Sequence, residues 1–219
     1  MWRTETGEAV LHLQRVGRLS QCPAVRFGRL PHPLGLRRWW LLYRVVPVQQ
    51  LMIRNAPFWI RHLRLQPHPE GGWYRETYRA DEVIPRATLP RRYRGPRAFS
   101  TAVYFLLAGR EFSTFHRLHS DEMWHFYHGA PFLVVDLAPD GKLTEHRLGL
   151  HPGRGELPQI VVPRGHWFAA RITTRRGYTL LGCTVAPGFD FADFEMADRA
   201  QLCAQFPRHN KLIRELTTA

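Results

Sequence analysis

The side chains with the clearest chemical potential lie in one short stretch, residues 115–129. It contains His116, His119 and Glu122, followed by alternating aromatic residues and Gly129. Imidazoles beside a carboxylate serve general acid–base catalysis or coordinate a divalent metal. The same residues also have a structural interpretation, a buried hydrogen-bonded pair without chemistry. We expect this stretch to form one wall of a pocket for a small molecule or a metal ion.

The elements that position this stretch are short strands with turns between them. Apolar–polar alternation, β-branched and aromatic residues and Gly/Pro punctuation indicate strands separated by tight turns. We expect strands over 73–79, 99–107, 112–119, 122–127, 131–138, 142–148, 159–162, 167–172 and 178–185. We also expect a short helix over 56–65, a turn at residues 188–193 and, after it, a helical end over 194–216. This order predicts an all-β jelly roll or barrel.

The segment 68–79 combines a double-glycine turn with a strand. Period-2 alternation predicts Trp73, Arg75, Thr77 and Arg79 on one face and the residues between them on the other. Arg75 or Arg79 could hold a carboxylate or phosphate through paired hydrogen bonds. The alternative, which we favour, is a structural role in which the strand pairs at a dimer interface and forms salt bridges there.

The net charge of +13 and the pI of about 10.7 raise the possibility of nucleic-acid binding. Residues 1–51 carry eight arginines against two glutamates, about half of the excess. A second arginine cluster, 86–97, is interrupted by Pro and Gly and is typical of a solvated loop. No RNA-binding aromatic signature or helix-turn-helix pattern accompanies the charge. We therefore expect no nucleic-acid partner.

The chain divides into a basic segment, 1–51, and a single folded domain, 52–219. Residues 1–51 have no clear period, and we expect a poorly ordered extension; an organellar transit peptide is the alternative. No run of about 18 apolar residues predicts a membrane span. Cys22, Cys183 and Cys203 are widely spaced, which is typical of reduced thiols in a cytoplasmic protein.

Four segments in order resemble the cupin superfamily and, within it, the cupin-5 family of uncharacterised small cupins. They are HPEGGWYRETYR (68–79), FHRLHSDEMWHFYHG (115–129), QIVVPRGHWFAA (159–170) and GCTVAPGFDFADFE (182–195). The resemblance covers about residues 65–216. It implies a double-stranded β-helix jelly roll, a homodimer and a small-molecule ligand in the barrel. It implies no established reaction.

The resemblance also allows a check for metal ligands. A typical cupin presents three histidines and a glutamate to the ion, and here His116 and Glu122 match one histidine and the glutamate. Leu118 and Phe168 stand at the two remaining positions. His119 could join them only if a bulge re-aims it. A divalent metal held by His116, Glu122 and His119 and a metal-free pocket therefore both stay open.

We hypothesise an isomerase or epimerase that acts on a sugar-like or keto substrate. In the sugar-nucleotide epimerase branch of the cupins a histidine works as general base. A His116 that titrates near neutrality, together with a desolvated Glu122 of raised pKa, suits proton transfer. The expected ligand-binding residues are Trp124, Phe126, Gln159, Trp167, Phe168 and Arg75. The alternatives are a non-catalytic ligand-binding or storage-type cupin and a metal-dependent cupin enzyme.

Overall fold

The computed structural model describes residues 55–174 and 176–218. The expectation for residues 1–51 therefore lies outside the described residues. Within them, no helix is both long and apolar enough to cross a membrane.

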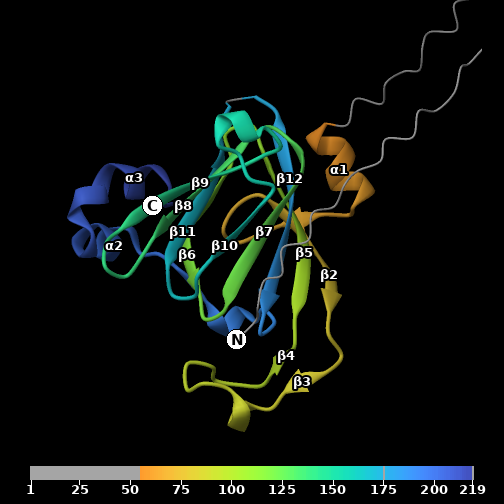
Figure 1. Ribbon diagram of the computed structural model, residues 1–219, viewed down its shortest axis with the longest axis vertical. Helices are drawn as coiled ribbons and strands as arrows, with labels where there is room; N and C mark the ends of the chain where they lie inside the picture. The colour runs from red at the N-terminus through yellow and green to blue at the C-terminus, as the bar shows by residue number, and fades with distance from the viewer. Residues whose placement is uncertain (1–54, 175, 219) are drawn as a thin grey trace, which may run out of the picture. The chain divides into compact units, whose positions relative to one another are not determined.

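Two antiparallel sheets face each other and form the jelly roll (Figure 1). One has the order β1 (Gln66–Pro67), β2 (Trp73–Arg79), β5 (Thr101–Ala108), β12 (Tyr178–Ala186), β7 (Asp121–Gly129) and β10 (Gln159–Val162). The other has the order β13 (Phe194–Met196), β6 (Phe112–Leu118), β11 (Trp167–Ile172), β8 (Phe132–Leu137) and β9 (Leu143–Leu148). The expected all-β jelly roll is confirmed.

Short helices flank the sheets, as expected for both ends of the domain. They are α1 (Ala56–His62), α2 (Arg199–Gln205) and α3 (Asn210–Glu215), with 3-10 turns η1 (Arg86–Thr88), η2 (Pro152–Arg154), η3 (Phe191–Asp193) and η4 (Pro207–His209). Helix α1 begins where the Asn55 side chain accepts a hydrogen bond from the Phe58 amide, 3.0 Å away. Helices α2 and α3 pack outside the five-stranded sheet, on a cluster that includes Trp167 and Phe115.

The core inside the barrel comes from the inward-facing residues of both sheets. Phe105, Trp124, Phe132, Phe168 and Leu181 are all at most 3% exposed there. Because strand residues alternate between faces, each strand contributes every second side chain to this interior. Polar residues that share this inner face lose their water, and this loss sets the chemistry of the site.

Strand β2 departs from the simple alternation that the sequence predicts. Its register against β5 pairs Glu76 with Val103 and Tyr78 with Ala102, so Thr77 is an extra residue in a β-bulge. The Thr77 hydroxyl donates to the Ala102 carbonyl at 3.1 Å. Because the bulge shifts the alternation by one residue, Arg79 faces the same side as Glu76. The prediction that Arg79 shares a face with Arg75 is therefore wrong.

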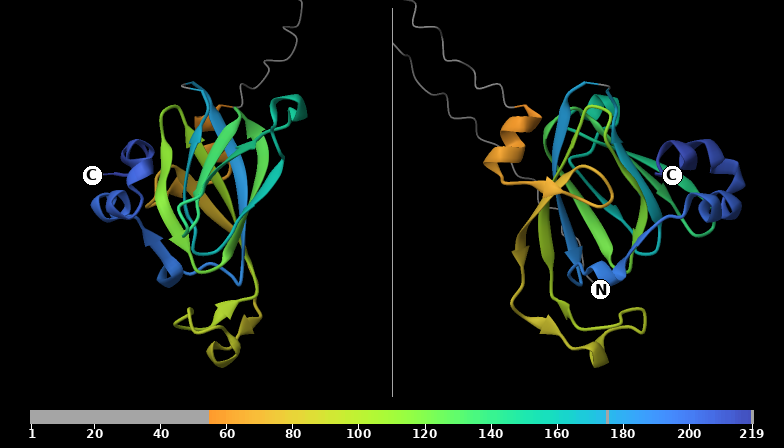
Figure 2. Two further views of the ribbon diagram at one scale, coloured as in Figure 1. Left: turned by 60° about the vertical axis from the view of Figure 1, so that its left-hand side comes forward. Right: turned by 180° about the vertical axis from the view of Figure 1, so that it is seen from behind.

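Residues 80–100 form an arm that extends from the barrel and contains β3 (Val83–Ile84) and β4 (Arg97–Ala98) (Figure 2). The expectation of a wholly solvated basic loop fails at Arg97, which is 4% exposed. Its guanidinium donates two hydrogen bonds of 2.5 Å to Asp193, which is also 4% exposed. The segment 188–193, expected as a turn into the C-terminal helix, thus also anchors the arm.

Replacing Arg97 tests this anchor. We expect Arg97→Met to lower the free energy of unfolding by about 3 kcal/mol, because it leaves the Asp193 carboxylate buried without its partner. Urea denaturation followed by circular dichroism measures the change. The matched control is Glu195→Gln, which breaks the half-exposed Arg117–Glu195 pair and should cost less than about 1 kcal/mol. Equal losses in the two variants would contradict the anchoring role.

Candidate functional site

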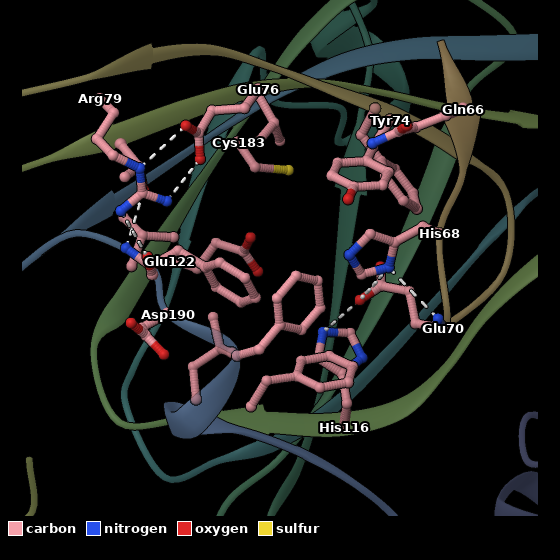
Figure 3. Close-up of a pocket in the computed structure, with 18 residues that line it drawn as sticks. Gln66, His68, Glu70, Tyr74, Glu76, Arg79, His116, Glu122, Cys183 and Asp190 are labelled. Carbon is pink, nitrogen blue, oxygen red and sulfur yellow. Dashed lines mark hydrogen bonds and ion pairs between the residues drawn. The ribbon is translucent and has the colours of Figure 1, made fainter. Parts of the chain in front are cut away.

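A cavity of about 440 Å³ lies inside the barrel (Figure 3). Side chains from both sheets and from the loop after β12 line it. The histidine, carboxyl, thiol and guanidinium groups of the lining gather in three places. They are a deep cluster of His68, Glu70 and His116, a second carboxyl at Glu122 beside Cys183, and a rim of Glu76, Arg79 and Asp190.

The deep cluster centres on the Glu70 carboxyl, which is 7% exposed. Its Oε1 accepts a hydrogen bond of 3.0 Å from the Ser113 hydroxyl. Its Oε2 lies 3.2 Å from His116 Nε2 and 3.4 Å from His68 Nδ1. Figure 3 shows both imidazoles converging on this carboxyl from different elements. One carboxyl oxygen is therefore shared by two histidines.

Hydrogen-bond partners fix the proton positions in this cluster. His116 Nδ1 lies 2.7 Å from the Thr114 carbonyl, so this nitrogen carries a proton and Nε2 of the neutral ring has a lone pair. His68 Nδ1 accepts from the Glu70 amide at 3.3 Å, so the one lone pair of this nitrogen already has a donor. The Nε2 lone pair of His116 can form a hydrogen bond with Glu70 Oε2 only when Glu70 itself carries the proton.

The electrostatics agree with a protonated Glu70. Burial raises the pKa of Glu70 well above its usual value, and the nearby Glu122 charge adds to this. Burial lowers the pKa of His116 to about 3 and that of His68 to about 4. Both histidines are thus neutral at physiological pH. The expectation that His116 titrates near neutrality is wrong, because its ring is 2% exposed.

The second carboxyl, Glu122, is the group that titrates near neutrality. Burial raises its pKa to about 7, although hydrogen bonds from Trp124 and Cys183 oppose the shift. Trp124 Nε1 donates to Glu122 Oε2 at 3.0 Å and so holds the carboxyl in place. The shift follows the direction that the sequence predicts. A carboxyl with this pKa can both accept and donate a proton at pH 7.

The rim carries an ion pair and aromatic side chains. Arg79 donates from Nε to Glu76 Oε1 at 3.0 Å and from Nη2 to Glu76 Oε2 at 2.6 Å. Its Nη1 donates to the Phe189 carbonyl at 3.2 Å, which ties β2 to the loop after β12. Aromatic rings complete the wall, and they belong to Tyr74, Phe105, Phe189, Phe191 and Phe194.

Gly71 and Gly72 form the turn that places the Glu70 side chain in the cavity. Both have positive φ, +109° and +73°. A Cβ on Gly71 would lie 2.2 Å from the Phe112 carbonyl oxygen, so only glycine allows this close approach. The same approach lets the Thr114 amide donate to the Glu70 carbonyl at 2.8 Å. The turn therefore presses Glu70 against β6, beside Ser113 and His116.

Of the residues selected from the sequence, His116 and Glu122 line the cavity together. Trp124 and Phe168 lie behind them: Trp124 holds Glu122, and Phe168 packs on the His116 ring with centroids 4.1 Å apart. His119 points elsewhere, with Nδ1 3.2 Å from Asp193 Oδ1.

The other four selected residues do not line the cavity, and each has a physical reason. Trp167 faces outward from its sheet, under the C-terminal helices and beneath Arg117. Gln159 is exposed on the edge strand β10. Arg75 lies on the opposite face of β2 from Tyr74 and Glu76. Phe126 is partly buried and packs against the barrel core.

Sequence reasoning missed the residues that come from the first strands. Glu70 and His68 belong to HPEGG, for which we favoured a structural role in the strand and turn. The available signal was the pair of glycines after Glu70, since adjacent glycines permit close backbone approach. Nothing in the sequence indicated the β2 bulge that brings Arg79 to the rim.

The side chains do not fit the metal set that the cupin pattern implies. Leu118 and Phe168 occupy two of the four ligand positions, and His119 is held by Asp193. Among residues 55–174 and 176–218, no three His, Cys, Asp or Glu side chains are arranged to hold a metal ion. Stable divalent sites use at least three protein ligands. We therefore derive no chemistry through a metal here.

Comparisons with known proteins agree with this fold. A family model, Cupin_5, described as Cupin superfamily (DUF985), matches residues 57–197. Protein SO0799 from Shewanella oneidensis is 38% identical, with a TM-score of 0.68, over 76% of this chain and 99% of that chain. A hypothetical protein from Leishmania major is 33% identical, with a TM-score of 0.69, over 75% of this chain and 99% of that chain.

A third relative comes from yeast. The uncharacterized protein YML079W of Saccharomyces cerevisiae is 28% identical over 143 residues, which are 61% of this chain and 71% of that protein. None of these three proteins is named for an activity.

The raised pKa of Glu122 predicts a pH-dependent stability. Between the ordinary carboxyl pKa and about 7, the folded protein binds this proton more tightly than the unfolded chain. Stability should therefore fall as pH rises from 5 toward 7, and this residue can contribute up to about 1.4 kcal/mol per pH unit. We expect Glu122→Gln to flatten this slope in urea denaturation at a series of pH values. The control is the exposed Glu145→Gln on β9, and equal slopes in all three proteins would contradict the prediction.

Proposed function

The chain belongs to the Cupin_5 family of the cupin superfamily, and we propose that its cavity binds a small organic molecule and transfers protons within it. The reaction class that fits is isomerisation or epimerisation of a sugar-like or keto compound. The catalytic groups are Glu122 and, in addition to the residues selected from the sequence, Glu70, whereas His116 positions Glu70.

The observation that carries this proposal is the presence in one cavity of two carboxyl groups with different pKa values. Glu122 has a pKa of about 7, whereas Glu70 stays protonated beside two neutral imidazoles. Glu122 lies across the cavity from Glu70 and His116 in Figure 3. Groups of similar type whose environments separate their pKa values are typical of paired acid and base roles.

The proton transfers balance over one catalytic cycle. The Glu122 carboxylate removes the proton from a carbon next to a carbonyl, while protonated Glu70 gives its proton to the carbonyl oxygen. The resulting enediol then returns its other hydroxyl proton to Glu70. Glu122 delivers the carbon-bound proton to the neighbouring carbon, so the product is an isomer and both acids regain their starting state.

His116 supports Glu70 in this scheme and does not act as the base. Its Nε2 accepts the Glu70 proton, and the Thr114 carbonyl fixes the ring so that this lone pair faces the carboxyl. After Glu70 has donated its proton, the neutral ring leaves the carboxylate without a compensating charge. The carboxylate therefore recovers a proton readily, which favours completion of the cycle.

A non-catalytic ligand-binding protein is the second candidate. One observation favours it: both ring nitrogens of His116 already have partners within the protein, as a purely structural histidine would. A binding protein would keep its ligand affinity when Glu122 loses its acid–base function. The two candidates therefore differ in exchange of carbon-bound protons.

Three expectations from the sequence remain predictions. They are the homodimer, the cytoplasmic location and independent folding of a domain that starts at Met52. Light scattering of the purified protein measures the first, and unfolding of the truncated chain measures the last.

Solvent deuterium incorporation tests the proposed reaction. Panels of free sugars, nucleotide-sugars and keto acids are incubated with the protein in D₂O and followed by NMR. We expect exchange at a carbon next to a carbonyl, and a loss of at least ~100-fold in rate with Glu122→Gln. Because the base must be ionised, the rate should rise with pH through about 7.

The matched control is Glu156→Gln, which removes another buried carboxyl whose Oε2 accepts a hydrogen bond from the His151 amide and which does not line this cavity. It should retain the exchange rate. Ligand binding without exchange, in the wild type and in Glu122→Gln alike, would refute catalysis and favour the second candidate.

A further inference from the structure

The cavity has an unusual charge balance for so basic a protein. The chain carries a net charge of +13, yet among the described residues the only Lys or Arg that lines the cavity is Arg79. Four acidic side chains line the same space, namely Glu70, Glu76, Glu122 and Asp190. Among the described residues, the excess positive charge therefore lies outside the cavity.

Three of the five N–H groups of Arg79 already donate to acceptors within the protein. Its Nε and Nη2 form a paired contact with the two oxygens of Glu76, and Nη1 donates to the Phe189 carbonyl. A paired guanidinium–carboxylate contact is the same geometry that a bound carboxylate or phosphate would need. Glu76 thus occupies the Nε/Nη2 edge, one of the edges through which the arginine could hold an anion, and neutralises its charge.

The histidines supply no positive charge either. His116 donates from Nδ1 to the Thr114 carbonyl and presents its Nε2 lone pair to Glu70, while His68 Nδ1 accepts from the Glu70 amide, so both rings are neutral. An anion that entered the cavity would therefore leave water, find no free cation, and lie near the Glu122 and Asp190 carboxyls. Burying an unpaired charge in this way is strongly unfavourable.

An organic cation is also poorly matched to the deep part of the cavity. The acid there is a protonated Glu70 hydrogen-bonded to its neighbours, and the surrounding wall is aromatic and aliphatic. Uncharged hydroxyl and carbonyl groups need no compensating charge. They can exchange hydrogen bonds with neutral partners such as Gln66 and Tyr74, while an apolar face of the ligand packs on Phe105.

We propose that the cavity selects an uncharged ligand rich in hydroxyl and carbonyl groups, and that the Glu76–Arg79 pair rejects carboxylates and phosphates. This inference rests on the proposed function and narrows its substrate class. Free sugars and related neutral carbonyl compounds are the substrates, whereas keto acids, sugar phosphates and nucleotide-sugars are excluded.

A charge-balanced fragment library tests the selection. It contains equal numbers of neutral, anionic and cationic fragments of matched size, and amide chemical shifts of Val103 and Val185 report binding inside the cavity. We expect neutral hydroxyl- or carbonyl-bearing fragments to outnumber anionic ones by at least ~10-fold, because burial penalises the unpaired charge. Comparable numbers of anionic hits, a majority of cationic hits, or no hits in the cavity would each overturn the proposal.

The variant Glu76→Gln tests the mechanism of rejection. Removing the carboxylate frees the Arg79 guanidinium, so inorganic phosphate should bind at the rim at least ~10-fold more tightly than in the wild type. The same cavity amide shifts report this binding. The matched control is Glu195→Gln, which frees Arg117 by breaking another paired contact, with bonds of 2.8 and 3.0 Å. An unchanged phosphate affinity in Glu76→Gln would overturn the role of the pair.

The deuterium-exchange panel separates this inference from the proposed function. Binding of uncharged ligands in preference to anions, without turnover of any of them, would support the selection of uncharged ligands and refute catalysis. Turnover of a keto acid or a nucleotide-sugar would support catalysis and overturn the proposal that the cavity selects uncharged ligands.

Discussion

Loss of water from polar groups inside the barrel governs the rest of the site. The Glu70 carboxyl and the His116 imidazole share a space that is almost closed to solvent, 7% and 2% exposed. A charge on either group would carry a large desolvation free energy there, so the pair is stable as a neutral acid and a neutral base. Glu122 has its own partner, Trp124, and the charged pair of Glu76 and Arg79 stays at the rim.

The strand framework could be predicted from the sequence because its signals are local. Alternation, β-branched residues and turn residues located strands such as 159–162 and 167–172 with the bounds that the structure has. The inward direction of His116 and Glu122 follows from the same alternation. Jelly-roll architecture therefore required only short-range patterns, together with the resemblance of four ordered motifs.

The chemistry of the site could be predicted only in part because its contacts are long-range. Ser113 and Glu70 are 43 positions apart in the chain, and no periodicity connects them. The pKa of Glu122 followed the expected direction because an apolar interior acts in one way on any carboxyl. The pKa of His116 did not, because the depth of burial of a single ring is a property of the assembled barrel.

The bulge at Thr77 makes the direction of the side chains after it on β2 independent of the direction of those before it. In a regular strand the two directions would be linked by simple alternation. Residues before it, such as Tyr74, keep their direction whatever happens at position 77, whereas residues after it are re-aimed by one extra residue. Without the bulge, Tyr78 would face the interior and Arg79 the solvent. In relatives of this protein, gain or loss of a single codon at this position could therefore alter the entrance of the cavity while its floor stays unchanged. Such a change would alter ligand specificity without any substitution in the deep acid–base cluster.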